Sequence, residues 1–207
     1  MSKEYGYIGK EVTQAFRDNK GIFTPQDIIE LDQENKWTNF GQLELIQTQT
    51  FTTTLNVDFL SIKPNTYSIH FATVSVDRQT TSNESVGIQF YESGVLETAT
   101  VYKYAYQNGE AGGTFNQSRS TGVNRLLATH FVDAGDDTFA YNYFYNLGDS
   151  TQYSFQTMHS TNIEGTNYKF RFGSGVLPQA STVDGIRFTS VTGTMTGDIS
   201  LYGIRSF

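Results

Sequence analysis

Three histidines and one acidic cluster are the residues of this chain best suited to chemistry. His70, His130 and His159 are far apart in sequence, and each lies in or beside a strand-like pattern. We therefore expect hydrogen-bonded structural histidines and no shared metal. The segment Asp133–Asp137 could bind calcium through its carboxylates, but it lacks the ordered spacing and terminal glutamate of an EF-hand loop. We expect an acidic turn there and leave calcium binding open.

The rest of the sequence gives no motif for catalysis. It contains no nucleophile elbow, phosphate-binding loop or zinc-protease helix, and it has no cysteine for a disulfide or a thiolate zinc site. A formal net charge of −7 without a basic cluster argues against nucleic acid as a ligand. No apolar run is long enough for membrane insertion. We predict a protein that is not an enzyme, with no catalytic residues, no metal and no other cofactor.

Residues 1–41 predict an extended arm followed by one short helix. Thr24 is a suitable N-cap, Pro25 suits the first helical position, and the helix would continue to about Lys36. The arm buries too little to fold alone, yet its apolar side chains would be costly in a purely solvated tail. We expect it to dock on a neighbouring subunit through Tyr5, Tyr7, Ile8, Phe16, Ile22 and Phe23.

Residues 42–207 predict an all-β domain. About ten strand-like runs recur at spacings of roughly a dozen residues, joined by glycine-rich turns. The 13 tyrosines and 16 phenylalanines must supply much of the core. This pattern favours an antiparallel β-sandwich, and the jelly roll is the leading candidate among such folds.

Two strand patterns carry more specific expectations. The runs Val183–Val191 and Asp198–Arg205 alternate apolar and polar residues around a turn-rich linker, which predicts a β-hairpin that closes the fold. In the run from Ile69 to Val76, the apolar positions shift phase by one residue, which predicts a β-bulge near Ala72–Thr73.

Two kinds of surface could carry specificity. The glycine-rich segment 107–121 predicts a long loop, and such loops are often functional. Alternating tyrosines form the second kind, at Tyr141–Tyr145 and at the candidate recognition residues Tyr102, Tyr104 and Tyr106. Exposed tyrosines could stack on sugars or pack in a subunit interface, and the interface is the favoured interpretation.

Both ends of the chain contain motifs that resemble a known class of protein. The N-terminal motif is GIFTPQDIIEL, continued by NKW at positions 35–37, and the C-terminal motifs are SGVLPQAS, VDGIRF and ISLYGI. They are similar to virion structural proteins of marine tailed bacteriophages, especially phages of cyanobacteria. The C-terminal pattern resembles the end of jelly-roll-like domains in phage fibres and decoration proteins.

The resemblance implies a structural role and carries over no catalytic residue. It implies a virion protein, assembled in the host cytoplasm as a homotrimer, that contacts capsid, neck or tail proteins through its arm and subunit interfaces. The alternative is a glycan-binding module of a tail fibre that reads a host surface glycan. Position on the particle stays open, because related domains occur in head decoration, neck and tail-fibre proteins.

Overall fold

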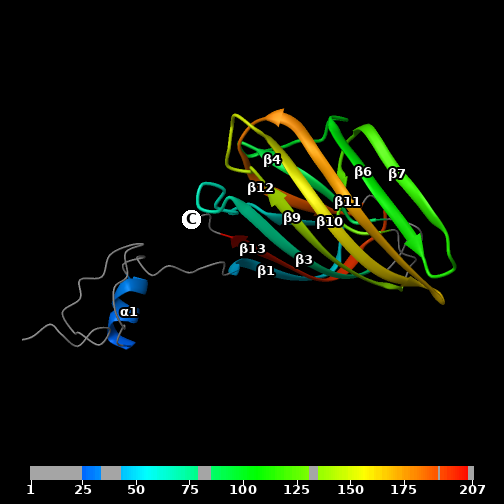
Figure 1. The fold of residues 1–207 in the computed structure, drawn as a ribbon, viewed down its shortest axis with the longest axis horizontal. Coiled ribbons are helices and arrows are strands. Elements are labelled where there is room, and N and C mark those ends of the chain that lie inside the picture. Colours follow the sequence, from blue (N-terminus) through cyan, green and yellow to red (C-terminus); the bar gives the residue numbers. More distant parts are fainter. Residues whose placement is uncertain (1–24, 34–42, 79–84, 131–134, 191, 205–207) are drawn as a thin grey trace, which may run out of the picture. The chain divides into compact units, whose positions relative to one another are not determined.

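The chain divides into two compact units, Met1–Gln42 and Leu43–Phe207. The computed structural model describes residues 25–33, 43–78, 85–130, 135–190 and 192–204 (Figure 1). The first unit contains helix α1 (Pro25–Gln33), which begins at the proline as the sequence predicts. Gln26 Nε2 donates to Glu30 Oε1 at 2.9 Å across one helical turn. The cap Thr24, the last predicted turn to Lys36 and all six docking residues lie outside the described residues.

The second unit is an all-β sandwich built from two antiparallel sheets, as predicted. The larger sheet has eight strands, in the order β1 (Leu43–Thr54), β13 (Met195–Ile204), β3 (Ile69–Arg78), β9 (Asp137–Tyr145), β10 (Tyr153–Glu164), β11 (Asn167–Ala180), β6 (Tyr102–Glu110) and β7 (Phe115–Val123). The smaller sheet has the order β2 (Asn56–Phe59), β12 (Val183–Thr189), β4 (Gly87–Glu92) and β5 (Val95–Leu96), and β8 (Leu126–Leu127) also pairs with β4.

The strand order is that of a jelly roll with additions to one sheet. If β5 and β8 are taken together as one strand, and the pairs β6–β7 and β10–β11 are set aside, eight strands remain. Numbered along the chain, they lie in the order first, last, third and sixth in one sheet (β1, β13, β3, β9). In the other sheet the order is second, seventh, fourth and fifth (β2, β12, β4, β5). Two interlocked Greek keys produce this arrangement. Strands β10, β11, β6 and β7 then widen the larger sheet beyond β9 (Figure 1).

A single large hydrophobic core lies between the two sheets. The smaller sheet contributes Phe59, Phe90 and Phe188, and the larger sheet contributes Phe144 and Leu201 among others, all essentially inaccessible to solvent. Phe188 packs edge-to-face on Phe59 with the ring centroids 5.9 Å apart. Ile199 and Leu201 point inward and Tyr202 points outward, as the alternation of the sequence predicts.

Three local predictions are wrong. The C-terminal strands β12 and β13 do not form a hairpin, because the chain crosses from one sheet to the other between them. Strand β3 pairs with β13 and β9 without a bulge, since Ile69 and Phe71 face outward while Ala72, Val74 and Val76 face the core. Segment 107–121 is not a long loop but the paired strands β6 and β7, joined by residues 111–114.

Polar side chains fill the inner face of the widened part of the larger sheet. They bind the backbone of residues 126–130, which forms only the two-residue strand β8 and so needs other partners. Gln156 Nε2 donates to the carbonyl of Leu127 at 2.8 Å, and Ser160 Oγ accepts from the amide of His130 at 2.7 Å. This network holds residues 126–130 in the interior, although only Leu126 and Leu127 pair with the smaller sheet as a strand.

Arg171 is the largest fully buried side chain in this network. Its Nε donates to Asn108 Oδ1 at 2.6 Å, and its Nη1 donates to Ser85 Oγ at 3.0 Å and to the Thr129 carbonyl at 2.9 Å. The guanidinium also lies 5.9 Å from the centroid of the Tyr106 ring. Burial lowers the pKa of Arg171 to about 10, so the side chain stays charged at neutral pH.

Candidate functional site

The three histidines lie on separate elements. His70 is fully buried, and its Nε2 lies 2.8 Å from the carbonyl oxygen of Ile62, as expected of a structural histidine. Burial lowers the pKa of His70, and the hydrogen bond to Ile62 opposes that shift. His130 is buried beside the Arg171 network, whereas His159 lies half-buried on the outer face of β10. Among the described residues, no group of three or more histidines, aspartates or glutamates could hold a metal ion.

The acidic turn is described only from Gly135 onward. Asp136 and Asp137 line a hollow of about 380 Å³ together with Phe139, Ile163 and Tyr168. Asp136 Oδ2 accepts from the amide of Gly165 at 3.3 Å, so this carboxylate helps hold the adjacent turn. Residues 133 and 134 lie outside the described part of the chain, and calcium binding stays an open prediction.

The predicted recognition residues Tyr102, Tyr104 and Tyr106 belong to the interior. Tyr102 and Tyr106 are buried, and the half-buried Tyr104 stacks on Tyr106 with the ring centroids 4.7 Å apart. The hydroxyl of Tyr106 donates to Gln156 Oε1 at 3.1 Å and accepts from the amide of Leu127 at 3.2 Å. Burial raises the pKa of both Tyr102 and Tyr106. A role in surface recognition is therefore wrong for Tyr102 and Tyr106, and Tyr104 is half-buried beside them.

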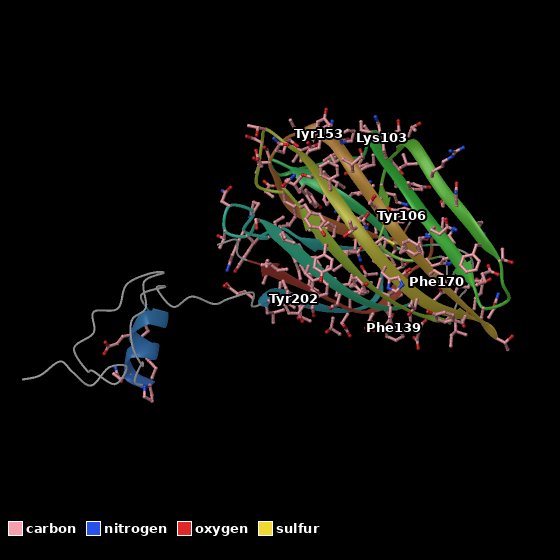
Figure 2. All side chains as sticks on the ribbon, in the orientation of Figure 1. Lys103, Tyr106, Phe139, Tyr153, Phe170 and Tyr202 are labelled. Atoms are coloured by element: carbon pink, nitrogen blue, oxygen red, sulfur yellow. The ribbon has the colours of Figure 1, made fainter. Side chains whose placement is uncertain are left out.

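The outer face of the larger sheet carries the aromatic side chains instead. We call this surface the aromatic face, and four of its members are labelled in Figure 2. Strand alternation turns these residues away from the core. Its members are Phe71, Phe115, Phe139, Tyr141, Tyr143, Tyr145, Tyr153, Phe155, His159, Ile163, Tyr168, Phe170, Phe172 and Tyr202.

The rings of the aromatic face touch one another across the strands. Phe71 on β3 lies 4.7 Å from Tyr143 on β9, and Tyr141 lies 5.4 Å from His159 on β10, measured between ring centroids. Phe170 and Phe172 on β11 stack nearly parallel at 6.2 Å. Neighbouring rings at these separations attract each other beyond simple area burial. The face is therefore a continuous layer that side-chain contacts hold in place.

An open groove of about 640 Å³ crosses the middle of the aromatic face. Its floor lies at Thr157 and Ser174, which are cross-strand partners and have much smaller side chains than their neighbours. Tyr143, Tyr145 and Phe172 are among the larger residues around this floor, and the Tyr145 hydroxyl lies 3.3 Å from Thr157 Oγ1. The groove thus combines aromatic rings with hydroxyl groups.

Formal charges lie around the aromatic face and not on its central strands β10 and β11, with Lys103 on β6 and Arg119 on β7 at one side and three aspartates at the opposite end. Asp77 and Asp137 are cross-strand partners there, and Asp198 lies opposite Ser75 on the neighbouring strand. On β10 and β11 the outward positions carry only uncharged or aromatic side chains and His159. Depletion of charge together with enrichment of tyrosine and phenylalanine is typical of the centre of a protein interface.

The outer face of the smaller sheet is polar by comparison. Arg187 Nε and Nη2 donate to the two carboxylate oxygens of Asp58 at 2.7 and 2.9 Å, and the Tyr91 hydroxyl donates to Asp58 Oδ1 at 3.0 Å. Partial burial alone would raise the pKa of Asp58. The hydrogen bonds from Arg187 and Tyr91 and the guanidinium charge outweigh this effect and lower it.

The ion pair between Asp58 and Arg187 should make part of the free energy of unfolding depend on pH in the acid range. We expect Asp58→Asn to lower the free energy of unfolding at pH 7 by about 1–2 kcal/mol. Because the folded pKa of Asp58 lies below its ordinary value of 3.8, this contribution is present above pH 3.8 and is lost as the pH falls through the lowered pKa. Urea unfolding of both proteins from pH 7 to pH 2 measures it. Asp198→Asn, at an exposed position, is the control, and a stability difference that persisted at the acid end would contradict the prediction.

The fold defines the class of the second unit as a jelly-roll β-sandwich with one aromatic and one polar outer face. Comparison with models of known protein families and with curated protein sequences finds no match to the chain. Within the described residues, no helix is long and apolar enough to span a membrane. The aromatic face is therefore the feature of the molecule that bears most directly on function.

Proposed function

We propose that this chain is a non-enzymatic structural protein of a bacteriophage particle, in which the jelly roll contacts neighbouring subunits through its aromatic face. The aromatic face is the observation that carries the proposal. Eight of its large side chains expose between 41 and 65% of their surface, although the rest of the fold buries its aromatic rings well. Contiguous apolar patches of this kind mark contact surfaces, because leaving them in water is unfavourable.

The sequence motifs at both ends of the chain agree with this role. GIFTPQDIIEL near the N-terminus and DGIRF with ISLYGI near the C-terminus resemble virion proteins of marine tailed phages. The C-terminal motifs form β12 and β13, which build the core of the jelly roll and carry no reactive constellation. The protein would assemble in the host cytoplasm as a homotrimer and join capsid, neck or tail proteins of the virion.

Removal of residues 1–20 tests how the protein is attached. We expect the shortened protein to fold, because residues 43–207 form a compact unit of their own, and to be lost from particles. Quantitative mass spectrometry of purified particles, from cells that supply either the shortened or the full-length protein, measures the loss. Full incorporation of the shortened protein would disprove the docking role of the arm. Absence of the full-length chain from particles would disprove the particle role itself.

A second candidate function is recognition of a glycan. The groove at Thr157 and Ser174 favours it, because tyrosine rings beside hydroxyl groups suit the apolar faces and hydroxyls of a sugar. This function would place the protein at a receptor-binding tip. It uses only a small part of the aromatic face, and for this reason we rank it second.

A further inference from the structure

We infer that the aromatic face is covered by a second copy of this chain. The inference rests on the proposed function, since it names the partner of the surface through which the protein would assemble. It also assigns that contact to particular strands: β9, β10 and β11, with Phe71 of β3 and Phe115 of β7 at its margins.

The first argument is the size of the exposed apolar area on the aromatic face. Eight members of the aromatic face are roughly half exposed, namely Phe115, Phe139, Tyr141, Tyr153, Phe155, Ile163, Tyr168 and Phe172. A large aromatic side chain has about 200 Å² of surface, so the exposed parts amount to on the order of 800 Å². A stable interface of standard size buries about 800 Å² on each partner. The face alone therefore supplies one complete side of such an interface.

The size of this exposed area also favours a protein over a saccharide as the partner. A sugar in the groove would contact Tyr143, Tyr145 and Phe172, around the floor formed by Thr157 and Ser174. It would leave the rings and the isoleucine nearer the strand ends in water. These include Phe139, Ile163 and Tyr168, which line a separate hollow next to the acidic turn. Only a partner with an extended surface covers both regions at once.

The distribution of charge favours a second copy over a strongly basic partner. Each chain carries a formal net charge of −7, so identical copies repel each other over most contact geometries. On β10 and β11 the outward positions hold no aspartate, glutamate, lysine or arginine, and the charges of the other strands lie at the margins, with the aspartates together at one end and Lys103 and Arg119 on β6 and β7. Two acidic copies can meet here without a like-charge contact at the centre. A strongly basic partner would gain nothing from this uncharged surface.

The groove explains how the contact becomes specific. A flat layer of rings packs at the density of a protein interior only where a hollow in one surface receives a projection from the other. Thr157 and Ser174 create such a hollow, and the Tyr145 and Thr157 hydroxyls offer hydrogen-bond partners beside it. A side chain of the neighbouring copy would fill this hollow.

The substitution Phe172→Glu tests the inference in the full-length protein. Phe172 is 48% exposed beside the groove, so a carboxylate there remains in water in the free subunit and becomes buried in the complex. Sedimentation velocity over a concentration series should show wild-type oligomers with a dissociation constant on the order of micromolar or tighter. For Phe172→Glu we expect an association at least about thirty-fold weaker, as for a central interface residue.

Leu60→Glu is the matched control. Leu60 is 61% exposed and lies outside the larger sheet, so the same charge should leave both the oligomer and the circular dichroism spectrum unchanged. Ser174→Trp provides a second variant, because an outward tryptophan fills the groove without adding charge and should also weaken association. If Phe172→Glu failed to fold, Ser174→Trp would decide alone.

Three results would overturn the inference. One is a wild-type protein that stays monomeric throughout the concentration series, and another is an oligomer that both face variants leave intact. The third is a monomer that binds a glycan array and loses this binding in Phe172→Glu, which would assign the groove to a saccharide. Each of these results would contradict self-contact through the aromatic face but would leave the location on the particle to be decided by the removal of residues 1–20. Conversely, a face-dependent oligomer that never joins particles would overturn the proposed function and leave this inference standing.

Discussion

Arg171→Met is expected to lower the free energy of unfolding by about 3–5 kcal/mol. Methionine has a similar length but no donors, so Asn108 Oδ1 and the Thr129 carbonyl would each lose a partner in the interior. A buried acceptor without a partner costs about 1–3 kcal/mol. The Tyr106 ring would also lose its cationic neighbour at 5.9 Å. Chemical denaturation monitored by circular dichroism measures the change.

Arg119→Met provides the control for this measurement. Arg119 lies on β7 at an exposed position, so its replacement should change the free energy of unfolding by no more than about 0.5 kcal/mol. If both variants were equally stable, the network around Arg171 would not hold residues 126–130 in the way its hydrogen bonds indicate.

Gly197→Ala is expected to destabilise the protein by about 3 kcal/mol. Gly197 lies at the start of β13 with φ at +149°, a conformation that residues with a side chain rarely adopt. A Cβ at this position would lie 2.1 Å from the carbonyl oxygen of Ser75 on β3. Because the nearest atom belongs to the backbone of β3 and not to a flexible side chain, strands β13 and β3 must move apart. Thermal unfolding should show a large decrease in the melting temperature.

Gly112→Ala separates this steric effect from the general effect of replacing glycine. Gly112 lies in the connection between β6 and β7, and a Cβ there meets no atom within 4 Å. We expect its stability to stay within about 0.5 kcal/mol of the wild type. Equal destabilisation by the two substitutions would contradict the close approach of β13 to β3.

The sequence was sufficient for the fold class because alternation and turn spacing are local properties. The alternating tyrosines Tyr141–Tyr145 lie on one strand, β9, and share one of its faces. The direction in which each strand faces was harder to predict. On β10 the polar residues Ser154, Gln156 and Ser160 point inward while Phe155 points to solvent, which reverses the usual expectation for a strand. For Gln156 and Ser160, hydrogen bonds to the buried backbone of residues 126–130 explain this reversal.

The two tyrosine rows show why the candidate site could not be predicted from sequence alone. Tyr102–Tyr106 and Tyr141–Tyr145 have the same spacing, yet the first row belongs to the interior and the second forms part of the aromatic face. The difference arises from residues distant in sequence, since Gln156 and Leu127 supply the partners of the Tyr106 hydroxyl. Sequence alternation places a residue on one of two faces, but it does not say which face another layer covers.

The closing strands illustrate the same limit. Alternation placed Ile199 and Leu201 on the core side of β13 correctly. It could not show that β12 belongs to the other sheet, because a hairpin and a crossover between sheets share the same local pattern. The choice depends on pairing with β1, β3 and β4, which are remote in sequence.

An electron cryomicroscopy reconstruction of the virion that we propose carries this chain would test the central claim most directly. The account predicts jelly rolls grouped around a symmetry axis, with the aromatic face of each copy buried against another copy and the polar face at Asp58 and Arg187 outside that contact. A particle without this chain would contradict the claim. A particle in which Tyr141, Phe155 and Phe172 face open solvent would contradict it equally.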